Sequence, residues 1–281
     1  MSAVSDLPHL IRLLDDETDI VRRAVRERLE GMRKELPAKL AELALQLSPS
    51  EERIIAELLA PSCREELVDR WLEWRDLPED DQRIEAALSQ ISAFLSGWKN
   101  TPRDVSHALD ELAQQIKADM KGQEIEPRSL AEYLFGNRGV ATRFRGNSRD
   151  YYSPENSNLL WVMKSGWGNP ISLCVIYRLV GRRLGMKIGG CNFPGHFLAR
   201  VLQEGETWLV DCFNRGRYML ATDVARHHPA ANPGMEELVH AEASSESIIM
   251  RVLRNLDDSF DKLGQGPERQ LMRKLAVRMM E

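Results

Sequence analysis

A continuous apolar segment at residues 171–184 constrains the fold of this chain more than any other feature. Its apolar side chains would point in every direction around a helix axis, and a helix that is apolar on all sides is buried. Pro170 suits the first helical position, with Gly168 or Asn169 as the cap, and Gly185 is a stop signal. We therefore predict a central helix that the rest of its domain covers. Three basic residues are expected to leave the core at its far end: Arg178, Arg182 and Arg183.

Three runs typical of strands follow this helix, at residues 187–192, 196–202 and 207–213. The short segment at 203–206 between the last two has the composition of a hairpin turn. A buried helix followed by antiparallel strands predicts an α+β fold.

Residues 1–121 have the pattern of successive amphipathic helices. Capping signals predict helix starts at Ser48-Pro49-Ser50-Glu51, Ser62-Cys63-Arg64-Glu65 and Thr101-Pro102-Arg103-Asp104. The segment at 13–29 resembles one HEAT-type helix pair, but no second copy follows, and a solenoid needs several units to share a core. An irregular helical domain is therefore the competing interpretation, with the helix pair as a packing or protein-contact surface.

Composition excludes several classes of protein. The 281 residues are 43% hydrophobic with a net charge of −5, which permits a sizeable core and argues against a nucleic-acid surface. No apolar run approaches the roughly 18–20 residues that span a bilayer, and the first residues lack a signal-peptide pattern. The four cysteines show no CxxC spacing, so we expect reduced thiols in a cytoplasmic protein.

Three residues could carry chemistry together: Cys174 on the buried helix, His196 at the start of a strand, and Asp211 on the next strand. A thiol nucleophile needs a base, and the base needs a third group that orients it. If the hairpin loop is Glu204-Gly205, His196 lies opposite Phe213, and Asp211 lies on the same face of the sheet as His196. The two side chains then lie diagonally within hydrogen-bonding reach. A three-residue loop without a bulge would place them on opposite faces.

The chain resembles the SirB-type transglutaminase-like proteins of bacteria over roughly residues 100–220. The resemblance rests on four motifs in order: Tyr151-Tyr152-Ser153-Pro154-Glu155-Asn156-Ser157, Gly168-Asn169-Pro170-Ile171-Ser172-Leu173, Phe193-Pro194-Gly195-His196-Phe197, and Asp211 followed by Phe213-Asn214. It implies a papain-like core in which a helix packs on an antiparallel sheet. It also implies a Cys-His-Asp triad spread over that helix and two strands.

One departure from the family concerns the nucleophile. In active transglutaminase-like enzymes the cysteine starts the central helix, about fifteen residues before its final glycine, and here that position is Pro170. Cys174 lies four residues further along the helix, which is a rotation of about 400° and a rise of about 6 Å. It therefore keeps the same face of the helix but loses the free N–H groups of the helix start. Those groups would lower the pKa of a thiol. Cys174 is therefore either a nucleophile or an inert core thiol.

Other residues admit alternatives. Ser172 is either a hydroxyl that replaces the thiol or a helix cap, and Asp211 could form a structural pair with Arg200 or His196. We expect no cofactor and no metal, since Cys191, Cys212 and His227-His228 lack ligand spacing. Asn169, Asn192 and Asn214 have the position of turn residues. Four arginines between 138 and 149 could bind an acidic group or form a solvated loop: Arg138, Arg143, Arg145 and Arg149.

These observations predict a helical domain at 1–121, a transglutaminase-like core at 122–235 and a helical tail at 236–281. Two functions stay open. In the first, the chain is a cysteine-dependent acyltransferase or peptidase that uses Cys174, His196 and Asp211. In the second, it is a pseudoenzyme whose cleft binds a peptide or protein partner without turnover. Neither function involves a membrane or a nucleic acid.

Overall fold

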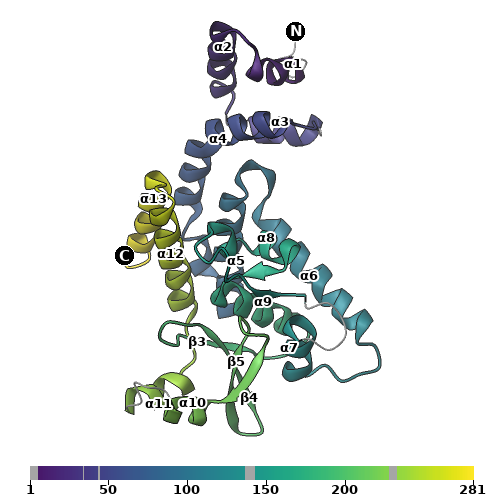
Figure 1. The fold of residues 1–281 in the computed structure, drawn as a ribbon, viewed down its shortest axis with the longest axis vertical. Helices are drawn as coiled ribbons and strands as arrows, with labels where there is room; N and C mark the ends of the chain where they lie inside the picture. The colour runs from purple at the N-terminus through teal and green to yellow at the C-terminus, as the bar shows by residue number, and fades with distance from the viewer. Residues whose placement is uncertain (1–5, 34, 44, 137–142, 228–232) are drawn as a thin grey trace.

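The computed structural model describes residues 6–33, 35–43, 45–136, 143–227 and 233–281. Helices occupy both ends of the chain, and an antiparallel sheet lies between them in the sequence, so the predicted α+β fold is confirmed (Figure 1). The helices are α1 (Leu7–Arg12), α2 (Asp19–Glu30), α3 (Leu36–Leu43), α4 (Pro49–Arg70), α5 (Asp80–Leu95), α6 (Pro102–Asp119), α7 (Pro127–Phe135), α8 (Leu159–Ser165), α9 (Pro170–Arg183), α10 (Ala221–His227), α11 (Pro233–His240), α12 (Ser245–Lys262) and α13 (Gly266–Arg278). The strands are β1 (Arg145–Gly146), β2 (Trp167–Gly168), β3 (Gly189–Cys191), β4 (Leu198–Gln203), β5 (Glu206–Asp211) and β6 (Arg217–Leu220).

The central helix is confirmed as α9. Asn169 is its cap, Pro170 is its first residue, and every residue from Pro170 to Gly181 is buried. Gly185 follows it with a φ of +82°, a left-handed conformation that glycine adopts without strain. The helices α5, α6 and α7 and the strand β4 all contact α9, so it lies at the centre of the largest apolar cluster.

One arginine of α9 corrects the prediction that all three leave the core. Arg178 is only 5% exposed, and its Nε donates to Asp81 Oδ1 on α5 at 2.5 Å. Arg182 and Arg183 do lie nearer the surface, where they pair with Glu79 and Glu85. Arg178 stays inside because a carboxylate from another helix compensates its charge, a contact that no local pattern reveals.

The first helices form a separate apolar cluster at one end of the molecule (Figure 1), made by residues between Leu7 and Leu59. The capping boxes at Ser48 and Thr101 are confirmed. The predicted helix start at Ser62 is wrong, because α4 continues from Pro49 to Arg70 with Pro61 inside it. Leu59 packs in the first cluster and Leu67 in the larger one, so packing on both sides of Pro61 overrides the local start signal.

The four-stranded sheet has the order β3-β4-β5-β6, all antiparallel. A two-residue turn, Glu204-Gly205, joins β4 to β5, with φ angles of 54° and 80° at these two residues. Gln203 pairs with Glu206 and Ala199 with Val210, as the parity argument requires. The strand β4 begins at Leu198, so His196 lies in the turn before it rather than within the strand.

The last two helices return to the first half of the chain. Figure 1 shows α12 and α13 beside α4, and Trp71 Nε1 donates to Leu275 O at 3.1 Å. Residues from Leu67 to Met279 therefore share one core. The boundaries at 121 and 235 and the HEAT-like character of 13–29 stay predictions. Among the helices described, none is long and apolar enough to cross a membrane.

Candidate functional site

The N-terminus of α9 is closed by a network of side chains. Asn169 Oδ1 accepts a hydrogen bond from Ser172 N at 2.9 Å, and Ser172 Oγ accepts one from Asn169 N at 3.1 Å. Asn169 Nδ2 also donates to Ser157 Oγ at 3.0 Å. Ser172 is only 2% exposed, so its hydroxyl acts in the cap, which is one of its two predicted roles.

The side chain of Cys174 faces the interior of the protein, next to Phe197, the residue before β4. The residue is 2% exposed, and its Sγ donates to Phe197 O at 3.6 Å. Its side chain is also adjacent to the buried thiol of Cys212, whose pKa is raised well above its usual value by burial and by this neighbour. The thiol predicted as a nucleophile is thus in contact with a backbone carbonyl and with another buried sulfur.

The structure brings His196 and Asp211 together as the hairpin parity predicts. His196 Nε2 lies 2.8 Å from Asp211 Oδ1, while the side chain of His196 keeps 23% of its surface exposed. Because a carboxylate only accepts, Nε2 carries the proton and donates in this bond. Arg200, the alternative partner for Asp211, pairs instead with Glu242.

Asn214 holds the carboxylate of Asp211 from the other side. Its backbone N–H donates to Oδ1 at 3.0 Å and its side-chain Nδ2 donates to Oδ2 at 2.8 Å. Burial raises the pKa of Asp211, but the hydrogen bonds from His196 and Asn214 outweigh it and leave the pKa below its usual value. The sequence pattern places Asn214 in a turn, where the structure has it, but misses its hydrogen bonds to Asp211.

Aromatic rings form one side of the site. Phe213 lies edge-on to His196 with 6.1 Å between ring centroids, and edge-on to Tyr151 at 6.2 Å. The ring of Phe213 also packs on Gly146, where a Cβ atom would come within 2.6 Å of it. Since Gly146 pairs with Gly168 in the β1–β2 ribbon, this contact holds the histidine side of the site against the entry to α9.

Several other predicted residues lie away from the site or outside the described residues. Arg145 stacks on Trp167 at 4.6 Å, and Arg143 donates to Gln115 Oε1. Arg138 and His228 lie outside the described residues. Within the described ranges, no group of three or more histidines, cysteines and acidic residues could hold a metal ion.

Comparison with known proteins agrees with this geometry. A family model described as the transglutaminase-like superfamily matches residues 103–254, a range that contains Cys174, His196 and Asp211. The chain belongs to the transglutaminase-like superfamily. No solved structure gives a significant match to it.

The relatives of this transglutaminase-like chain include bacterial and animal proteins. A UPF0162 protein of Xylella fastidiosa (strain Temecula1) is 33% identical over 196 residues, which cover 65% of this chain and 68% of the relative. A UPF0162 protein of Pseudomonas aeruginosa is 28% identical over 186 residues, covering 65% and 66%. F-box only protein 21 of Homo sapiens is 29% identical over 209 residues, covering 70% of this chain and 31% of that protein.

The contacts of Asp211 predict a pH-dependent contribution to stability. Because the pKa of Asp211 is lower in the folded chain, its contribution is present above the unfolded pKa, about 3.9, and is lost as the pH falls through the folded value. We expect Asp211→Asn to lower the free energy of unfolding by about 1–3 kcal/mol at neutral pH. Urea unfolding should show this deficit shrinking as the pH falls below about 4. The exposed Asp223→Asn serves as control, and a deficit that does not change with pH would contradict the assignment.

Proposed function

We propose that this transglutaminase-like chain binds a peptide or protein segment over His196, Tyr151 and Phe213, without forming a thioester. The burial of Cys174 carries this proposal: the thiol is 2% exposed and bonded to Phe197 O, whereas His196 and its aromatic neighbours reach the surface. This arrangement leaves His196 and its aromatic neighbours accessible to a ligand, whereas the thiol of Cys174 is not presented to one.

The exposed aromatic residues beside His196 support binding. Tyr151 and Tyr152 are 45% and 46% exposed, and Lys262 lies 4.4 Å from the ring centroid of Tyr152. Tyrosines that are exposed and held rigidly by neighbours are typical of residues that dominate protein interfaces. The match to part of F-box only protein 21 supports use of this domain as a module within longer proteins.

Selection from a random dodecapeptide library displayed on phage tests this proposal with the full chain as bait. Enriched peptides should bind the wild type with a Kd in the micromolar range, about −8 kcal/mol. His196→Ala and Tyr151→Ala should each weaken binding about tenfold or more. His107→Ala, a solvent-exposed histidine on α6, is the matched control and should bind as the wild type does. Peptides that bind His196→Ala and Tyr151→Ala as tightly as the wild type would contradict the proposal.

Acyl transfer is the second candidate function, and the hydrogen bond between His196 and Asp211 favours it. In this mechanism His196 takes the proton of Cys174, and the thiolate attacks an amide carbonyl. The C–N bond breaks, the amine leaves with that proton, and water or another amine then cleaves the thioester. Asp211 orients the imidazole. This function requires Cys174 to leave its contact with Phe197.

Three finer assignments accompany the proposal. We place the chain in the SirB-type subgroup on its sequence motifs, and in the cytoplasm because its four cysteines are free. We also keep the division into a helical domain, a core and a helical tail. Variants truncated near residue 121 or near residue 235 would test that division, because a separate domain folds without its neighbours.

A further inference from the structure

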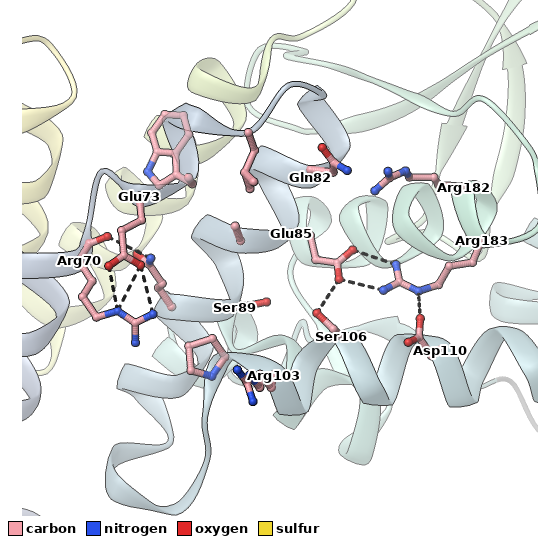
Figure 2. A pocket seen from close by; sticks show the side chains of 15 residues that line it. Arg70, Glu73, Gln82, Glu85, Ser89, Arg103, Ser106, Asp110, Arg182 and Arg183 are labelled. Atoms are coloured by element: carbon pink, nitrogen blue, oxygen red, sulfur yellow. Dashed lines mark hydrogen bonds and ion pairs between the residues drawn. The ribbon is translucent and has the colours of Figure 1, made fainter.

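A cavity lies at the far end of α9 from His196. It is lined by the segment Glu73–Asp76, the helix α5, the start of α6 and the last residues of α9, and its volume is about 680 Å³ (Figure 2). Leu77, Ala86 and Pro102 provide apolar wall. The 14 residues of α9 span about 21 Å, so this cavity is separate from the site at the other end.

Four side-chain polar atoms of the cavity wall have no hydrogen-bond partner among the described residues: Trp74 Nε1, Gln82 Oε1, Ser89 Oγ and Gln90 Oε1. Trp74, Ser89 and Gln90 are 0%, 3% and 8% exposed. Burial of a polar atom without a partner is costly, and native folds seldom leave one so. Four such atoms border one cavity, and a ligand bound there would supply the missing partners.

Three of these residues belong to one face of α5. Gln82, Ser89 and Gln90, together with Ala86, recur at the spacing of one helix face. The side chains of glutamine and serine rotate about their χ angles, so their oxygens can turn into the cavity while the backbone of α5 stays in place. The face therefore offers two amide oxygens that accept hydrogen bonds and one hydroxyl that accepts or donates.

The charged groups of the cavity leave one guanidinium without a partner. Glu73 pairs with Arg70 at 3.1 Å, while Glu85 and Asp110 both pair with Arg183, at 2.8 and 2.6 Å. The side chain of the exposed Arg103 makes no ion pair or hydrogen bond with any described residue, and Figure 2 draws no contact from it. Arg70 and Arg183 thus pair with all three carboxylates of the wall, and the unpaired charged group at the rim is the guanidinium of Arg103.

We propose that this cavity binds a carboxylate that stands next to a secondary amide, as at the C-terminus of a peptide or at an acidic side chain. Arg103 would bind the carboxylate, and the indole N–H of Trp74 would donate to the amide carbonyl. The amide N–H would donate to the side-chain oxygen of Gln82 or Gln90. This site makes no use of His196, so its test is independent of the function proposed above.

Titration of the full ¹⁵N-labelled chain with three dipeptides, followed by NMR, tests the proposal. The probes are acetyl-Ala-Ala with a free C-terminus, acetyl-Ala-Glu-amide and the neutral acetyl-Ala-Ala-amide. We expect the indole N–H peak of Trp74, assigned with Trp74→Phe, to shift saturably with at least one of the acidic probes, with a Kd of about 1 mM. The neutral probe should bind about tenfold more weakly or not at all. The acidic probe that binds more tightly identifies the source of the carboxylate.

Two arginine variants complete the test. Arg103→Ala, on the surface of α6, should weaken binding of the acidic probes about tenfold, while Arg23→Ala, an exposed arginine of α2, should leave it unchanged. A Trp74 peak that does not move with any probe would mean that water alone serves these polar atoms, and would overturn the proposal. Equal binding of neutral and acidic probes would overturn the role of Arg103.

Discussion

Replacing Trp71 with alanine is expected to lower the free energy of unfolding by about 3–5 kcal/mol. The side chain is fully buried, and its ring lies edge-on to Trp74 with 6.4 Å between centroids. Its Nε1 donates to the carbonyl of Leu275 on α13. The substitution would leave a large cavity and remove a hydrogen bond where the first half of the chain meets its last helix.

Urea unfolding monitored by near-ultraviolet circular dichroism measures this loss. Trp71→Phe keeps most of the buried ring and loses the hydrogen bond, so we expect a smaller cost of about 1–2 kcal/mol. Equal stability of Trp71→Ala and the wild type would show that α13 does not belong to the main core.

Replacing Asp81 with asparagine is expected to cost about 2–4 kcal/mol, the second largest effect, because it leaves a buried charge. The side chain of Arg178 is 6% exposed, and Asp81 is its hydrogen-bonding partner at 2.5 Å. Glu242, the other carboxylate nearby, lies 3.5 Å from Arg178 Nη2 and compensates only part of the charge.

Two comparisons make the Asp81 prediction specific. Glu79→Gln removes an ion pair of similar length from Arg182, but this pair is 32% and 60% exposed, so we expect a cost below about 1 kcal/mol. The double variant Asp81→Asn, Arg178→Met should recover much of the lost stability, since no buried charge is left unpaired. Equal costs for Asp81→Asn and Glu79→Gln, measured by the same urea titration, would contradict this account.

Local sequence patterns predict the parts of the fold that depend on short-range rules. The all-round apolar composition of α9 specifies its burial, and its cap and stop residues specify its ends. Hairpin parity predicts the contact between His196 and Asp211 because a two-residue turn fixes the register of β4 and β5. The two residues are 15 positions apart in sequence, and the register of the hairpin brings the start of β4, next to His196, beside Asp211.

Features that depend on distant segments are not predictable in this way. The burial of Arg178 depends on Asp81, 97 residues earlier, and the continuity of α4 through Pro61 depends on packing at both of its ends. In the site, the packing of Phe213 on Gly146 joins the turn after β5 to the strand β1, which share no sequence pattern. The buried polar face of α5 also escapes prediction, because glutamine and serine on a helix usually face solvent.

Alkylation of the four cysteines tests the central claim, which is that Cys174 is a core thiol and the His196 site binds without acyl transfer. The native chain is treated with iodoacetamide across a range of pH, and mass spectrometry measures the labelling of each cysteine. The half-buried Cys63 should react first. Cys191 and Cys212 are internal standards for buried thiols, because burial raises the pKa of Cys191 to about 11 and that of Cys212 well above its usual value. We expect iodoacetamide to label Cys174 only when it also labels Cys191 and Cys212, after the chain has unfolded. Rapid labelling of Cys174 well below about pH 8, abolished by His196→Ala, would contradict the account and establish an activated thiolate.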